Sequence, residues 1–282
     1  MSEATMEQFY PGAAEVAHYT CRRAPGPLAI DGDLTKPAWL AAERSPRFVD
    51  VITGRPALLD TRAAALWDDD YLYIAFWLDE PSVEARMAKR DSPVFYENDI
   101  EVFIDGGDCY YEFELNALNT IYEVFFIWQD AYQRGGRFDV PEFDLFSGRA
   151  VSFGGNFDRI GEHFWRGVHP RGTRWAFPEW DLPGLKTAVR IDGALNDPST
   201  VDRGWTAELA FPWAGMAWLA DGRPLPPRDG DTWRLLFARY EKLNLMGNDV
   251  FTGWTWTRVG TMDNHVPECF THLHFSTEVA AG

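Results

Sequence analysis

The sequence predicts an all-β protein, a β-sandwich of antiparallel strands rather than an α/β fold. Many short segments alternate apolar and polar residues with the period of two that a half-buried strand requires. Turn signals rich in Gly, Pro and Asp separate these segments, and helical periodicity is scarce. With 282 residues, 46% of them hydrophobic, and no convincing linker, the chain is expected to fold as a single large domain.

Taken in order, residues 1–24 are expected to be an irregular N-terminal arm and residues 25–278 the domain itself. A helical turn should begin at Pro37, because proline is tolerated at the first helical position. A second short helix is expected over 81–90. Strands are expected at 28–30, 63–67, 71–78, 100–105, 111–116, 121–128, 185–191, 205–211, 233–240, 250–256 and 273–275.

The segment 96–119 is the centre of this organisation. Gly106-Gly107 separates two alternating runs and predicts a hairpin. If the aliphatic residues of both runs face a core, four polar side chains share the other face: Glu101, Glu112, Glu114 and Asn116. Three neighbouring carboxylates repel one another, so a cation, arginines, a shared proton or a hydroxyl-rich ligand should compensate. The alternative is a solvated sheet face.

Residues 133–179 interrupt the alternation with a long stretch rich in Gly, Arg and aromatic residues. Its aromatic content argues against disorder, so we interpret it as a packed insertion that covers the acidic face. Trp165 and Trp175 within it offer flat apolar surfaces on which a sugar ring could stack. The alternative interpretation is an extension of the core.

Composition narrows the choice of partners. A net charge of −17 argues against a nucleic-acid backbone or an anionic membrane, and it fits a neutral or cationic ligand or calcium. Three cysteines without motif spacing predict neither a disulfide framework nor a zinc site. The N-terminus has no signal-peptide pattern and no apolar run is long enough to span a membrane, so a cytoplasmic location is expected, or a secreted one if a leader has been removed.

Several stretches, in this order and spacing, carry a family resemblance. They are 30–34 with Trp39, 65–73, 98–105, 111–116, 204–213 and 265–270. Together they span about 25–276 and resemble the family-9 carbohydrate-binding modules, in their stand-alone bacterial branch, which are DOMON-like β-sandwiches.

The resemblance implies a two-sheet, jelly-roll-like sandwich that binds sugars and carries structural calcium. In that family two tryptophans sandwich the sugar ring, while a Glu, an Arg and an Asn hold its hydroxyls. The Glu falls on Glu101 and the Asn on Asn116, whereas Glu114 occupies the arginine position. The tryptophan positions fall near Phe95 and near Asn264 or His265.

The first functional hypothesis is binding of a carbohydrate or polyol through an acidic concave face beneath the insertion. Its candidate ligand-binding residues are Glu101, Asn116, Glu112, Phe95, Tyr96, Arg239, His265, Trp165 and Trp175. The alternative is a carbohydrate-active hydrolase, lyase or epimerase in which Glu101, Glu114 and His265 supply acid–base chemistry. A third interpretation is an interaction domain whose acidic face docks a basic protein. The sequence does not fix the oligomeric state.

Acidic turns offer candidate calcium ligands. Asp105 and Asp108 flank the central hairpin turn and suit a hard cation that takes several oxygen ligands. The turn at 68–70 is similar. The alternative is that each is only a turn.

Overall fold

The structure, a computed structural model, describes residues 16–155, 169–245 and 247–280. Over these residues it is mostly β, and its strands join into one 14-stranded sheet. The helices are short, as in α2 (Pro37–Ala41), which begins at the proline as expected, and α3 (Ala217–Ala220). No helix in the described part of the chain is long and apolar enough to cross a membrane.

The sheet runs in the order β10-β11-β4-β3-β1-β14-β12-β5-β6-β7-β9-β8, and β13 pairs with β12 and β2. The strands are β1 (His18–Arg23), β2 (Val49–Asp50), β3 (Thr61–Trp67), β4 (Tyr71–Asp79), β5 (Asp99–Asp105), β6 (Cys109–Asn116), β7 (Ile121–Trp128), β8 (Val151–Phe153), β9 (Arg174–Phe177), β10 (Lys186–Asp192), β11 (Gly204–Pro212), β12 (Thr232–Leu245), β13 (Asn248–Thr255) and β14 (Thr271–Val279). The strands expected from 63 onward are confirmed.

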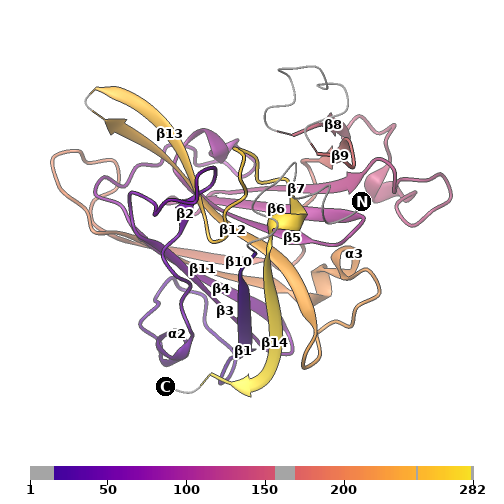
Figure 1. Ribbon diagram of the computed structural model, residues 1–282, viewed down its shortest axis with the longest axis horizontal. Helices are drawn as coiled ribbons and strands as arrows, with labels where there is room; N and C mark the ends of the chain where they lie inside the picture. The colour runs from indigo at the N-terminus through magenta and orange to yellow at the C-terminus, as the bar shows by residue number, and fades with distance from the viewer. Residues whose placement is uncertain (1–15, 156–168, 246, 281–282) are drawn as a thin grey trace.

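The sheet is mixed, so the expectation of purely antiparallel strands is wrong. β1 runs parallel to both β14 and β3 and joins the two halves of the sheet. Figure 1 shows β1 and β14 side by side at this junction. β1 lies within residues 1–24, for which the sequence predicts an irregular arm. The sequence misses this strand because six residues give too short an alternation to be recognised beside an irregular N-terminus.

The two halves of the sheet pack face to face. Phe211 of β11 contacts Phe113 of β6 with ring centroids 5.4 Å apart, although these strands are far apart in the sheet order. Phe76 of β4 meets Phe237 of β12 in the same way at 6.1 Å. The aliphatic residues of the central hairpin point into this core, as their alternation predicts.

Two expected local elements are absent from the described chain. Residues 28–30 form no strand and residues 81–90 form no helix. In the second segment, the backbone amides of Arg86 and Met87 donate to the carboxylate of Glu97. A side chain therefore satisfies the amides that a helix would have used.

The insertion both extends the core and reaches the opposite face of the sheet. β9 continues the sheet beyond β7, and β8 forms its edge (Figure 1). Phe138 and Phe143 pack into the main core, whereas Phe153 lies on the other face. Residues 156–168, which include Trp165, lie outside the described residues.

Candidate functional site

The face of β5, β6 and β12 that points away from the main core carries the candidate site. On β5, the side chains of Asp99, Glu101 and Phe103 alternate with the aliphatic core residues. In the register of the hairpin, Glu101 stands opposite Glu114, and Phe103 stands opposite Glu112. The acidic residues are thereby gathered on one face, as the sequence predicts, but they are buried rather than solvated.

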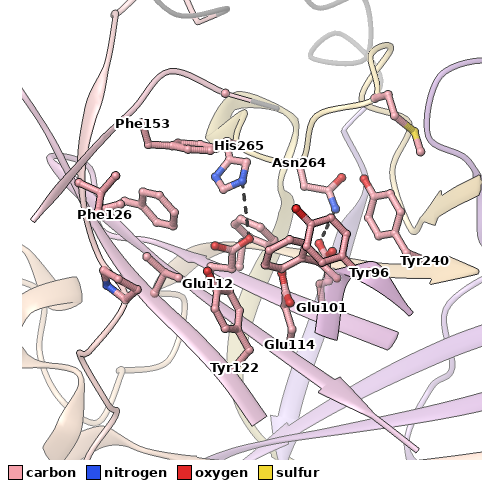
Figure 2. A pocket seen from close by; sticks show the side chains of 18 of the residues that line it. Tyr96, Glu101, Glu112, Glu114, Tyr122, Phe126, Phe153, Tyr240, Asn264 and His265 are labelled. Atoms are coloured by element: carbon pink, nitrogen blue, oxygen red, sulfur yellow. Dashed lines mark hydrogen bonds and ion pairs between the residues drawn. The ribbon is translucent and has the colours of Figure 1, made fainter. Parts of the chain in front are cut away.

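A cavity of about 640 Å³ lies over this face. Figure 2 shows the three glutamates at its base and Asn264 and His265 above them. The aromatic side chains in its wall are Phe95, Tyr96, Phe103, Tyr122, Phe126, Phe153, Tyr240 and Phe251. The polar and charged side chains are Glu101, Glu112, Glu114, Lys242, Asn264 and His265.

Glu101 occupies the middle of the pocket floor. Its Oε2 atom accepts a hydrogen bond of 2.6 Å from Nδ2 of Asn264, and the residue is 5% exposed. Burial raises its pKa to about 8, the hydrogen bond from Asn264 opposes that rise, and the charge of Asp263 adds to it. The carboxyl is therefore shielded from water although it borders the cavity.

The pKa values of the neighbouring acidic residues are raised as well. Burial, followed by the charge of Glu112, raises the pKa of Glu114 well above its usual range. Burial and the charge of Glu101 do the same to the pKa of Asp99. Burying mutually repelling carboxylates is costly unless protons, cations or hydrogen-bond donors compensate.

His265 closes the other side of the pocket. Its Nε2 lies 3.6 Å from Oε1 of Glu112, and its Nδ1 lies 3.0 Å from the hydroxyl of Tyr110. The ring of Phe153 packs on the imidazole at 4.4 Å between centroids. Burial and the nearby charge of Arg174 lower the pKa of His265 well below its usual value. The imidazole is therefore held neutral between a carboxyl group and aromatic rings.

Two expected ligand-binding residues do not line the cavity. Asn116 ends β6, where its Nδ2 donates to the carbonyl of Met87 and to Glu97. Arg239 lies on the core face of β12 and pairs with Glu80 at 3.2 Å and Glu241 at 2.8 Å. Arg239 therefore does not neutralise the acidic floor.

The expected aromatic residues divide in a similar way. Phe95 and Tyr96 line the mouth of the cavity, and Tyr96 is 61% exposed. Trp175 packs against the main core, because its neighbour Ala176 occupies the position that faces the cavity. Trp165 lies outside the described residues.

The carboxylates of Asp105 and Asp108 already have cationic partners. Arg234 contacts Asp105 at 2.5 Å, and Arg171 contacts Asp108 at 2.6 Å. In the 68–70 turn, Asp68 accepts hydrogen bonds from two backbone amides and from the hydroxyl of Tyr73. Each of these three carboxylates therefore has a partner within the protein.

Several site residues escaped the sequence interpretation. Asp99 could have been found, because it lies two residues before Glu101 and therefore shares its face. Tyr240 likewise alternates with the core residues of β12. Asn264 entered the sequence interpretation only as a position near one of the family's tryptophans, and Phe153 has no local signal, since each residue approaches the hairpin from a distant segment.

No family model matches the chain, and no curated protein matches it significantly. Among solved structures, a presumed carbohydrate-binding protein from Bacteroides uniformis aligns over 92% of this chain and 99% of its own, with a TM-score of 0.57 and 15% sequence identity. The two chains therefore share a fold over nearly their whole lengths.

Two further structures are of a family-9 carbohydrate-binding module from Caldicellulosiruptor kristjanssonii, in complex with cellotriose and with glucose. They align over 92% of this chain and over 94% and 96% of their own chains, with 11% identity. Their TM-scores are 0.48 and 0.47.

Proposed function

We propose that this protein binds a sugar or glycoside in the cavity over β5, β6 and β12. The observation that carries the proposal is the combination of carboxyl and amide groups with aromatic walls in one cavity. Its volume of about 640 Å³ lies within the usual range of small-molecule sites, roughly 300–1,000 Å³.

The chemistry of the wall suits a sugar better than a wholly apolar ligand. Carboxylates accept charge-assisted hydrogen bonds from hydroxyl groups, and an amide both donates and accepts. Glu101 and Asn264 together supply this pattern at the floor. Aromatic rings such as Phe126 and Phe153 give flat surfaces for the C–H faces of a pyranose.

The fold supports the same proposal. The Bacteroides uniformis protein that shares the fold is a presumed carbohydrate-binding protein. Because one fold can host many functions, this likeness adds weight only together with the chemistry of the cavity.

Calorimetric titration with a panel of mono- and oligosaccharides, in a buffer containing calcium, tests the proposal. At least one sugar should bind with a dissociation constant below millimolar. Above pH 8, where the Glu101 carboxyl is ionised, Glu101→Gln should weaken that binding about tenfold or more, because a hydrogen bond to a charged group contributes roughly 1.5–3 kcal/mol.

Glu278→Gln is the matched control, since the side chain of Glu278 is 76% exposed at the end of β14 and far from the cavity wall. It should bind the same sugar as well as the wild type. A panel in which no sugar binds better than millimolar would refute the proposal.

A second candidate function, acid–base catalysis on the bound sugar, is favoured by one contact. Glu112 and His265 lie 3.6 Å apart in the cavity wall, where both could reach a substrate hydroxyl. Screening sugars and glycosides between pH 5 and 8 tests this. Turnover that disappears in His265→Gln supports it, and silence across the panel eliminates it.

A further inference from the structure

Three buried carboxylates converge beside the cavity, and two of them, Glu101 and Glu114, line it. Asp99 and Glu101 project from β5, and Glu114 projects from β6 directly opposite Glu101. One oxygen of each lies within 4.8 Å of one oxygen of each of the others. The three residues are 0%, 5% and 1% exposed, in that order.

These oxygens lack the partners that buried charges require. Neither Oδ1 nor Oδ2 of Asp99 has a hydrogen-bond partner, and neither does Oε2 of Glu114. The backbone amide of Tyr240 is close enough to oppose the rise in the pKa of Asp99, but it does not have hydrogen-bond geometry to either carboxylate oxygen. Buried carboxylates are normally paired, hydrogen-bonded or bound to a metal.

Two arginines near the three carboxylates are engaged elsewhere, and Lys242, which lines the cavity, is exposed and forms no ion pair with any of the three. Arg239 pairs on the core face of β12. Arg174 donates to the hydroxyl of Tyr110 and to the carbonyl of His265. Across the described residues, no ion pair joins a lysine or arginine to Asp99, Glu101 or Glu114. No lysine or arginine among the described residues therefore neutralises these three carboxyl groups.

Two further buried oxygens in the cavity wall near the carboxylates lack partners of their own. The hydroxyl of Tyr240 is buried and unpartnered, and burial, then the charges of Glu101, Asp263, Asp99 and Glu114, raise the pKa of that phenol. Oδ1 of Asn264 is buried and unpartnered, although Nδ2 of the same amide holds Glu101. Each of these atoms can act as a neutral oxygen ligand.

We propose that Asp99, Glu101 and Glu114 bind a calcium ion at the floor of the cavity. An all-oxygen set without His or Cys selects a hard cation over zinc. Oxygens bound at about 2.3–2.6 Å to one calcium ion lie at most about 5 Å apart, and the triad meets this limit. An irregular set of carboxylate, amide and hydroxyl oxygens suits the flexible coordination of calcium better than the octahedron that magnesium demands.

The ion site stands independently of the proposed sugar binding, although the two adjoin. Glu101, Glu114, Tyr240 and Asn264 also line the cavity. A calcium ion held there would neutralise the negative charge of these carboxylates.

Calorimetric titration of the chelator-treated full chain with calcium chloride, in the absence of sugar, tests the proposal. One calcium ion should bind per chain. Asp99→Asn and Glu114→Gln should each weaken binding at least about tenfold, because affinity follows the number of charged ligands. Asp108→Asn is the control, since Asp108 belongs to the acidic turn that pairs with Arg171.

Thermal unfolding distinguishes the loss of a calcium-binding side chain from a general loss of stability. Without calcium, Asp99→Asn should unfold at the same temperature as the wild type or higher, since it removes one of three repelling charges. Saturating calcium should raise the unfolding temperature of the wild type and of Asp108→Asn, but not that of Asp99→Asn.

The proposal fails if the wild type binds no calcium, or if Asp99→Asn and Glu114→Gln both bind calcium as tightly as the wild type. Calcium binding in a protein that binds no sugar would leave the ion site standing and refute the proposed function. Sugar binding by a protein that binds no calcium would support the proposed function and refute the ion site.

Discussion

Asn264 donates a hydrogen bond of 2.6 Å to Glu101, and this contact fastens the loop that follows β13 to the middle of β5. The two residues are 163 positions apart in the chain. Both side chains are buried and both line the cavity. Asn264 therefore fixes the direction of the carboxyl group that we expect a sugar to contact.

Replacing Asn264 with alanine should weaken sugar binding about tenfold and lower the free energy of unfolding by about 1–3 kcal/mol, because it leaves Glu101 buried without its donor. Calorimetry and urea denaturation measure the two effects. Asn244→Ala is a suitable control, since Asn244 donates a hydrogen bond to Asp249 at the exposed end of the β12–β13 pair. Unchanged sugar affinity in Asn264→Ala would show that the position of Glu101 does not matter for binding.

Phe153 should contribute a stacking surface. It lines the cavity and packs against His265 and Phe126 at 4.4 and 5.2 Å between ring centroids. Phe153→Ala should weaken sugar binding about five- to tenfold, since aromatic contacts contribute roughly 0.5–1.5 kcal/mol beyond buried area. Phe146→Ala, at a side chain that is 86% exposed and outside the cavity, should leave the affinity unchanged in the same titration. Equal affinities for both variants would exclude stacking on Phe153.

Arg239 should act on stability rather than on binding. Arg239→Met removes the partner of Glu80 and Glu241 inside the sandwich and should cost about 3–5 kcal/mol in urea denaturation. Arg203→Met, at a side chain that is 85% exposed, should cost almost nothing. The folded Arg239→Met protein should bind sugar normally, and a selective loss of binding would instead restore the ligand-contact role expected from the sequence.

A histidine cluster at the junction of the two sheet halves should make stability depend on pH. Nδ1 of His18 lies 2.7 Å from Nε2 of His274, and its ring lies 4.8 Å from that of His272. Partial burial, then the charge of His18, lowers the pKa of both His272 and His274. Arg234 adds to the effect on His272, and the hydroxyl of Thr232 bonds His274.

Because the folded protein holds these protons less tightly than the unfolded chain, the contribution to stability is complete above the ordinary pKa of 6.5. It should be lost as the pH falls from there through the lowered folded values. Urea denaturation at pH 8 and pH 5.5 measures this loss. His274→Gln should reduce the difference between the two pH values, and an identical difference in both proteins would contradict the mechanism.

The sequence predicted much of the cavity floor, for a local reason. Alternation in the central hairpin placed Glu101, Glu112 and Glu114 on one face, and all three line the cavity. Asn116 shares that alternation, but it lies at the end of the strand. There its side-chain amide donates a hydrogen bond to the carbonyl of Met87 and does not line the cavity. Arg239 shares the core-facing alternation of Phe237, so the same rule, applied to β12, would have placed it in the interior.

By itself, the sequence determined most of the strands from residue 63 onward and the apolar face of the central hairpin, because the alternation of apolar and polar residues is a property of neighbouring positions. Only the tertiary structure decided what stands opposite the acidic face. Asn264, His265 and Phe153 reach it from distant segments, and the parallel strand β1 joins the halves of the sheet. Strand order and the positions of the loops depend on contacts between residues far apart in the chain, and the local alternation of residues does not specify those contacts.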